Sequence, residues 1–269
     1  MHMTVSILEK SFTILYMSTS TNSANSEHLE LFIDSASRTS GIPENFSITL
    51  SQPITKVLYS EVVSAEIPLT YYAVNSTNNV LVWNSGADHM CTITPGTYGT
   101  LDFIAELKSK MNAQQSGYTI TYSSITFKLT FANASSFTLQ YTNTSGTSTI
   151  GKVIGMNSTA NSSTGTSVTL PNTINLGGTK YILIKSDTLV RPKIIRPYLN
   201  TAYDNTLYKV PVTGEPGDIM VEKNLYTNLL KYGVRQTLRN IDFQLYDDAG
   251  NILNLNGMNW SITVNLITG

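Results

Sequence analysis

Hydrophobic and polar residues alternate in short runs along most of the 269-residue chain. The alternation is clearest in residues 29–33 and 46–50, where every second position holds Leu, Ile or Phe. A period of two places successive side chains on opposite faces of a strand, so each of these strands has one buried face and one wet face. The same reasoning predicts further strands at 55–66, 79–84, 118–122, 125–131, 137–141, 181–184, 219–222, 241–246, 252–255 and 260–267. Two packed antiparallel sheets, a sandwich or barrel, are therefore expected.

One segment has the period of a helix instead. Phe103, Leu107 and Met111 recur at intervals of four and fall on one helix face. Thr100 is the expected N-cap, and Asp102 lies in the first turn, where the helix dipole favours negative charge. With the strands that follow, this helix predicts a small α+β subdomain inserted into the β-sandwich.

The expected domain organisation has three parts. Residues 1–28 form an N-terminal arm of mixed character, residues 29–89 and 157–269 form the β-sandwich, and residues 90–156 form the inserted α+β subdomain. Residues 157–166 consist only of Asn, Ser, Thr, Gly and Ala and contain no bulky apolar residue. An exposed loop is therefore expected after the insertion.

The composition is polar but poor in charge. Charged residues make up 13% of the chain and the formal net charge is -1, whereas soluble globular proteins average about 25% charged residues. Ser, Thr and Asn fill the remaining polar positions, which suits wet sheet faces and spares packed copies like-charge repulsion. Lectins, phage fibres and capsid shells share this composition. The lack of a basic excess argues against a dedicated nucleic-acid binder.

No arrangement of residues in the sequence predicts catalysis, and no cofactor is expected. The three histidines stand in unrelated contexts, and no Gly-x-Ser-x-Gly elbow or phosphate-binding loop is present. His89 and Cys91 lie two apart on an expected strand, as two metal ligands could, but further ligands are not evident, so ordinary packing is expected. Asp247 and Asp248 are expected to serve a tight turn rather than a calcium site.

Export and membrane signals are weak. Cys91 is the single cysteine, so an intrachain disulfide is excluded. No apolar run approaches the roughly 20 residues of a membrane span. The first residues lack the basic region of a signal peptide, so synthesis and folding in a reducing cytosol are expected.

Several motifs, taken in order, resemble those of one protein family. They are LELFIDSASRTSGIPENFSITL (29–50), VVSAEIPLTYYAVNSTNN (62–79), ITPGTYGTLDFIAELKSKMN (93–112), STIGKVIGM (148–156) and FQLYDDAGNILNLNGMNWSITVNLI (243–267). This ordered set resembles the penton (vertex, minor capsid) proteins of virophages, polinton-like elements and related large double-stranded DNA viruses.

The resemblance implies a jelly-roll β-sandwich that forms a homopentamer. Such a pentamer would occupy the fivefold vertices of an icosahedral virion and contact the major capsid protein, after synthesis in the host cytoplasm. A host surface receptor is a further candidate partner. A receptor- or carbohydrate-binding β-sandwich, such as a fibre head, is the alternative that the residues leave open.

Five residues are candidates for a subunit interface. Asp34 and Arg38 lie in the turn-rich bridge between the first two strands, where they either pair locally and cap the bridge or contact a neighbouring subunit. Arg191, Lys193 and Arg196 form a basic stretch interrupted by prolines, which is expected to be a solvated or intersubunit loop. Contact of this stretch with packaged genome is the less favoured alternative.

Overall fold

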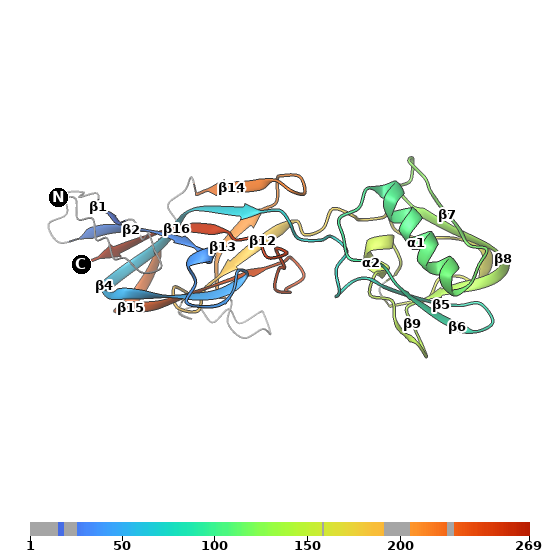
Figure 1. The fold of residues 1–269 in the computed structure, drawn as a ribbon, viewed down its shortest axis with the longest axis horizontal. Helices are drawn as coiled ribbons and strands as arrows, with labels where there is room; N and C mark the ends of the chain where they lie inside the picture. Colours follow the sequence, from blue (N-terminus) through green and yellow to red (C-terminus); the bar gives the residue numbers. More distant parts are fainter. Residues whose placement is uncertain (1–15, 19–25, 158, 191–204, 225–228) are drawn as a thin grey trace. The chain divides into compact units, whose positions relative to one another are not determined.

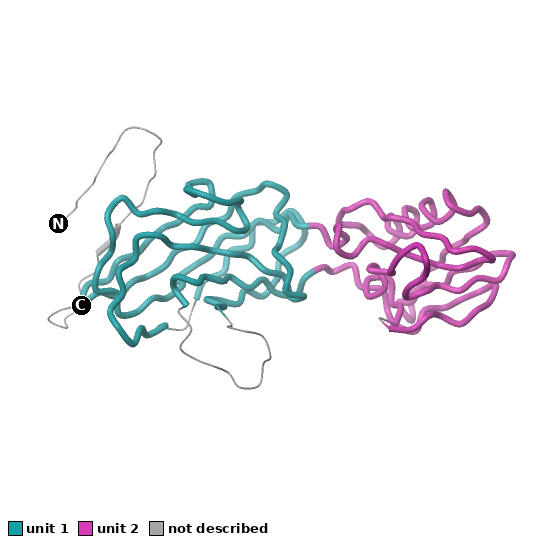
Figure 2. The backbone as a smooth tube through the Cα atoms, turned by 90° about the horizontal axis from the view of Figure 1, so that it is seen from below, with its two compact units in different colours: residues 1–71, 179–269 teal, residues 72–178 magenta. Residues whose placement is uncertain are grey.

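A computed structural model describes residues 16–18, 26–157, 159–190, 205–224 and 229–269. The chain divides into two compact units, which are distinguished by colour in Figure 2. Unit 1 comprises residues 1–71 and 179–269, and unit 2 comprises residues 72–178. In the described parts, no helix has the length and hydropathy needed to cross a bilayer.

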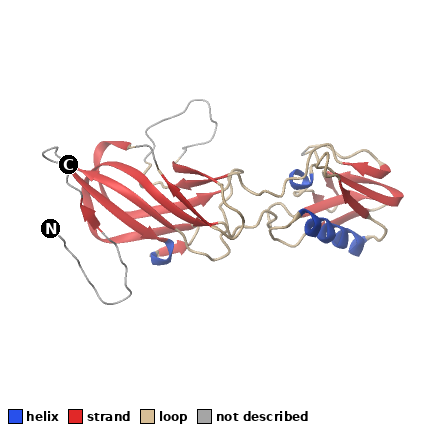
Figure 3. Ribbon diagram, turned by 90° about the horizontal axis from the view of Figure 1, so that it is seen from above, coloured by secondary structure: helices blue, strands red, loops and turns tan. Residues whose placement is uncertain are grey.

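Unit 1 is built from long antiparallel strands (Figures 1 and 3). Its elements are β1 (Tyr16–Ser18), β2 (Glu27–Asp34), the 3-10 helix η1 (Ser35–Ser37), β3 (Ser40–Ile42), β4 (Asn45–Pro68), β12 (Tyr181–Lys185), β13 (Thr206–Pro211), β14 (Ile219–Lys223), β15 (Leu230–Tyr246) and β16 (Ser261–Thr268).

The strand β4 belongs to both layers of the sandwich. Residues 45–49 pair with β15, whereas residues 57–66 pair with β16, and residues 57–60 also keep their pairing with β15. Between the two halves, Lys56 has a φ of 58°, and the pairing register with β15 shifts. The strands predicted at 45–50 and 55–66 are thus two halves of one bent strand, because the hydrogen-bonded ladder continues round the bend.

The strand order identifies the sandwich. The first layer runs β2, β16, second half of β4, β14, and the second runs first half of β4, β15, β12, β13. In chain order the eight segments are β2, first half of β4, second half of β4, β12, β13, β14, β15 and β16, so the layers read 1-8-3-6 and 2-7-4-5. This is the strand order of an eight-stranded jelly roll. The predicted all-β jelly-roll fold is confirmed.

Alternate residues of these strands fill the core of unit 1. Leu31 and Ile33 of β2 are buried, and so are the apolar residues of 46–50 in β4, as the alternation predicted. At one end of the core the rings of Phe46, Phe243 and Trp260 contact one another, with centroids 5.7 to 6.2 Å apart. The Trp260 indole N–H donates to the Pro43 carbonyl at 2.7 Å, so its polar atom is satisfied.

Unit 2 places a helix on one face of an antiparallel sheet, the α+β arrangement that the sequence predicted (Figure 3). Phe103, Leu107 and Met111 are the buried residues of α1. The sheet order is β11, β8, β5, β6, with β7 also paired to β8. The elements are β5 (Val80–Asn84), β6 (Asp88–Thr92), α1 (Thr100–Gln114), β7 (Thr119–Tyr122), β8 (Leu129–Gln140), β9 (Thr142–Asn143), β10 (Gly146–Thr147), α2 (Gly151–Ile154) and β11 (Gly165–Thr169).

The structure places the limits of the insertion differently from the sequence. Unit 2 runs from residue 72 to residue 178, rather than from 90 to 156. The reason is strand pairing: β5 joins β6 and β8, and β11 joins β8, so both flanking strands belong to the sheet of unit 2. Pairing partners cannot be derived from the alternation within one strand.

Three local predictions also differ. The strands predicted at 125–131 and 137–141 are one strand, β8, which begins only at Leu129, and residues 125–127 lie in the loop before it. Helix α1 begins at Thr100, and the N-cap position is Gly99, which provides no side-chain hydrogen bond. The predicted strand 252–255 is reduced to a single bridge between Tyr246 and Ile252. Only its first part stays with β15, where the Leu253 N–H donates to the Leu245 carbonyl at 2.9 Å, whereas the Leu255 N–H donates to the buried Glu44 carboxylate.

Candidate interaction surfaces

Asp34 and Arg38 hold the bridge between β2 and β4 together. Asp34 Oδ1 accepts a hydrogen bond from the Ala36 N–H at 2.7 Å and so caps η1. The Arg38 guanidinium donates to the carbonyls of Ser35 at 2.9 Å and Gly41 at 3.1 Å. Among the described residues the only ion pair within 4 Å is Glu106–Lys110, so Asp34 and Arg38 do not pair with each other. The capping alternative matches these contacts, and a contact with a neighbouring subunit stays a prediction.

Arg191, Lys193 and Arg196 lie outside the described residues. The turn that precedes them is fixed by Asp242 of β15. Its carboxylate accepts hydrogen bonds from the N–H groups of Asp187 and Thr188, both at 2.8 Å.

The other residues considered for metal binding, namely His89, Cys91, Asp247 and Asp248, make packing or turn contacts. The His89 ring stacks on Trp83 with centroids 5.3 Å apart. Cys91 is buried, and this burial raises the pKa of its thiol to about 12, so the reactive thiolate is scarce. Asp247 caps its turn by accepting from the Asn251 N–H at 2.7 Å, and Asp248 accepts from the Lys180 N–H at 3.2 Å. Over the described ranges, no group of three or more His, Cys, Asp or Glu could hold a metal ion.

The first apolar surface lies on β14, at an edge of the first layer. Within the described residues β14 pairs only with β4, which leaves one side of its backbone free to pair. Ile219 is 68% exposed and Val221 is 55% exposed, whereas Met220 between them is buried. We call Ile219 and Val221 the edge surface. The sequence predicted this strand but not the exposure of Ile219 and Val221. The feature that could have indicated it is the run of three consecutive apolar residues, which places apolar side chains on both faces of the strand.

The second apolar surface belongs to unit 2, at the loop between β7 and β8. Ile125 is 87% exposed and Phe127 is 54% exposed. Phe127 also borders a pocket of about 290 Å³, and its neighbour in the pocket wall, Thr100, precedes Leu101, which is 78% exposed. We call Leu101, Ile125 and Phe127 the hairpin patch. The pocket is lined by Thr100, Tyr122, Phe127, Thr173, Ile174 and Leu176.

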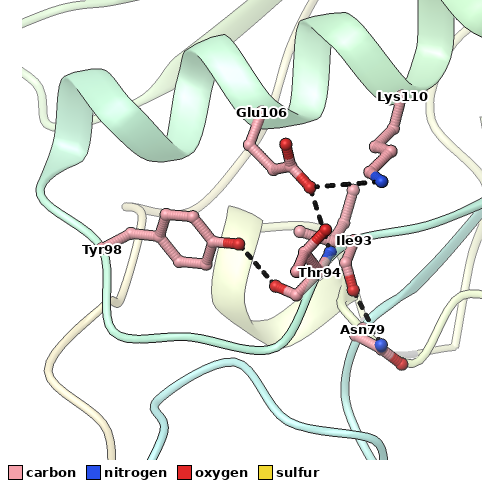
Figure 4. A network of polar contacts seen from close by, with 6 residues as sticks. All are labelled: Asn79, Ile93, Thr94, Tyr98, Glu106 and Lys110. Carbon is pink, nitrogen blue, oxygen red and sulfur yellow. Dashed lines mark hydrogen bonds and ion pairs between the residues drawn. The ribbon is translucent and has the colours of Figure 1, made fainter.

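A polar network ties helix α1 to the chain that leaves β6 (Figure 4). Glu106 Oε1 accepts from the Thr94 N–H at 3.1 Å and lies 3.5 Å from Lys110 Nζ. The Tyr98 hydroxyl donates to the Thr94 carbonyl. Hydrogen bonding with Thr94, and more weakly the charge of Lys110, hold the pKa of Glu106 below its ordinary value of 4.5.

The lowered pKa of Glu106 predicts an acid-sensitive unit 2. A carboxyl whose pKa is lowered on folding contributes stability that is complete above its ordinary pKa of 4.5 and is lost as pH falls through the folded value. Glu106→Gln should therefore flatten the fall in unfolding free energy on the acid side of pH 4.5. Urea unfolding at a series of pH values measures this. Asp102→Asn, on the same helix but outside the network, is the control, and an unchanged slope in Glu106→Gln would contradict the assignment.

The search of curated proteins finds no match. Among solved structures, the chain is similar to the selenomethionine-labelled penton protein of mavirus, with 9% sequence identity and a TM-score of 0.45. The alignment covers 89% of this chain and 99% of the mavirus protein.

A family model matches most of the sequence, including all of unit 2 and most of unit 1. Its description is "Family of unknown function (DUF5901)", and the match runs from residue 20 to residue 252. The chain belongs to this family.

Proposed function

We propose that this chain is a structural capsid protein that forms a homopentamer, the penton, at the fivefold vertices of an icosahedral virion. The observation that carries the proposal is the edge surface of the jelly roll, where Ile219 and Val221 are exposed on a strand that, among the described strands, pairs on one side only. Two large β-branched residues on a free sheet edge are a liability in a monomer, and burial against a neighbouring copy removes it.

Ring closure requires a particular kind of contact. In a ring of five, the edge surface of one copy meets a different surface on the next, and this head-to-tail contact repeats until the ring closes. Stable obligate contacts commonly bury more than about 2,000 Å². The low charged fraction of 13% limits repulsion between the packed copies. The pentamer would then contact the major capsid protein around it, which places the chain in the virion.

The motifs of the sequence support the vertex role in particular. They recur in penton order from residue 29 to residue 267 and include the segment around α1 in the inserted unit. Mechanism here means geometry and buried area, and no catalytic turnover is proposed.

The test combines assembly state with substitutions at the edge surface. The purified full chain should have the mass of five copies by light scattering and appear as rings in negative stain. The double variant Ile219→Asp, Val221→Asp should weaken assembly at least about 100-fold, because burying each unpaired carboxylate costs several kcal/mol. It should stay folded, since charged residues are tolerated on exposed edges.

The matched control is Ile219→Thr, Val221→Thr, which keeps β-branched side chains and adds no charge. It should fold as the parent does and assemble better than the Asp variant. A monomeric parent at high concentration would overturn the proposal. A rod-shaped trimer would favour a fibre head instead.

A further inference from the structure

The two layers of unit 1 carry charges of opposite sign. The strands of the first layer contain one lysine, Lys223, against six acidic residues, namely Glu27, Glu30, Asp34, Glu61, Glu66 and Glu222. The strands of the second layer contain one acidic residue, Asp242, against five basic ones, namely Lys185, Lys209, Lys231, Arg235 and Arg239. A chain whose formal net charge is only -1 thus separates its charges between the two layers of the sandwich.

Strand pairing brings carboxylates of the first layer to its outer face. Directly paired residues of neighbouring strands lie on the same face of a sheet. Leu31 and Ile33 of β2 are buried in the core, so the residues that alternate with them, Glu30 and Asp34, lie on the outer face. Asp34 belongs to a row of paired residues, Asp34–Ser261–Glu66–Val221. We call Glu30, Asp34 and Glu66 the acidic face, and Val221 of the edge surface lies on the same side of the sheet.

The lysines of β12 and β13 lie on the outer face of the second layer. Ile182 and Ile184 of β12 are buried in the core, so Tyr181, Leu183 and Lys185 face outward. Leu183 pairs with Lys209 of β13 on one side and with Tyr246 of β15 on the other. We call Tyr181, Leu183, Lys185, Lys209 and Tyr246 the basic face.

Both lysines of the basic face lie over tyrosine rings. Lys185 Nζ is 4.3 Å from the centroid of the Tyr246 ring, and Lys209 Nζ is 4.0 Å from the centroid of the Tyr181 ring. These contacts hold the two ammonium groups close to the sheet. The face therefore combines fixed positive charge with apolar and aromatic surface.

The charges of the two faces are not matched inside the described chain. Glu106–Lys110 is the only ion pair within 4 Å among the described residues, so Glu30, Asp34 and Glu66 have no described basic side chain at that distance. The Glu66 carboxylate accepts hydrogen bonds from neutral groups, the hydroxyls of Ser64 at 3.1 Å and Ser261 at 2.6 Å. Each face therefore presents its charge outward.

The opposite charges of the two faces select a second copy of this chain as the partner. A head-to-tail ring needs two different surfaces on one chain that complement each other. The acidic and basic faces meet this requirement, because they belong to different layers and carry opposite charge. Each also combines charged and apolar side chains, since Val221 is paired with Glu66, and Leu183 with Lys209. Contact between two identical faces would bring like charges together, which opposes association.

We infer that, in the ring, the acidic face of one copy contacts the basic face of the next, with Ile219 and Val221 packed against Leu183 and its neighbouring tyrosines. This inference rests on the proposed function, since it requires head-to-tail association. It names the surface that the edge surface meets on the neighbouring copy.

Charge reversal and its rescue in the full-length chain test the inference. Lys185→Glu, Lys209→Glu should raise the concentration at which the ring half-dissociates by at least about 100-fold, because like charges then face each other across the contact. Glu30→Lys, Glu66→Lys should have the same effect. The chain with all four substitutions exchanges the signs of both faces and should return to within about tenfold of the parent. Light scattering over a dilution series measures each value.

The matched control is Lys108→Glu, Lys152→Glu in unit 2. Both lysines are exposed, and the double substitution changes the net charge by the same amount as the reversal of the basic face. It should leave the half-dissociation concentration nearly unchanged. Urea unfolding checks that each variant is folded. If a reversal variant does not fold, Lys185→Gln, Lys209→Gln takes its place and should raise the concentration by about tenfold.

The outcomes separate the two proposals. A parent chain that never assembles overturns both. A parent that forms the five-copy ring, with reversal or Gln variants that assemble as well as it does, overturns the inference and leaves the proposed function standing. A folded chain with all four substitutions that stays monomeric also overturns the inference, because the two faces would then act on different partners. Nucleic-acid binding that is lost in the lysine variants while the ring is unaffected overturns it as well.

Discussion

Phe243→Ala is expected to lower the unfolding free energy of unit 1 by about 3–5 kcal/mol. The ring of Phe243 is fully buried and contacts Phe46 and Trp260, with centroids 5.7 and 6.2 Å away. Removal of the ring leaves a cavity between the paired strands β4 and β15 and the side chain of Trp260. Because domains are stable by only about 5–15 kcal/mol, this loss is a large fraction of the total.

The two tryptophans make the measurement specific. Trp83 lies in unit 2 and Trp260 in unit 1, and the chain has no other tryptophan. In a Trp83→Phe background, urea unfolding followed by fluorescence reports unit 1 alone. Labelling of the buried Cys91 thiol reports the opening of unit 2. Phe243→Leu, which keeps part of the volume, should cost less, and an equal loss at both reporters would contradict two separately packed units.

Gly155→Ala is expected to destabilise unit 2 by about 2–5 kcal/mol. Gly155 ends α2 with a φ of 91°, a conformation that costs an alanine about 1–2 kcal/mol. A Cβ at this position would also overlap the Asn172 carbonyl, and overpacking adds about 1–3 kcal/mol. The overlap cannot relax easily because the Asn172 N–H donates to the Gly155 carbonyl at 3.0 Å.

Gly86→Ala is the matched control for Gly155→Ala. Gly86 is also in unit 2 and has a φ of 84°, but a Cβ there meets nothing within 4 Å. It should cost only the conformational part, about 1–2 kcal/mol. The rate of Cys91 labelling should rise much more in Gly155→Ala than in Gly86→Ala, and equal rates would show that the overlap is relieved.

The candidate surfaces were predictable only in part. The bridge that holds Asp34 and Arg38 could be found from its turn residues, because Asp, Gly and Pro act on their immediate neighbours. The exposure of Ile219 and Ile125 could not, since an apolar residue in a strand or loop is by default interpreted as buried. Exposure depends on what the rest of the chain packs against that position, and no local pattern contains this information.

The sequence by itself determined most of the elements and the buried faces of the clearest ones. The alternation at 29–33 and 46–50 predicted which side chains are buried, and the four-residue spacing from Phe103 to Met111 predicted the buried face of α1. These features are local, because a backbone of fixed geometry converts spacing directly into direction.

Only the tertiary structure decided how the strands pair. The passage of β4 from one layer to the other, the order of the jelly roll and the limits of unit 2 at residues 72 and 178 all depend on pairing between distant segments. Period-two strands specify a face but no partner, so many pairings satisfy the same alternation. The choice among them is made by the total apolar surface that the whole chain can bury at once.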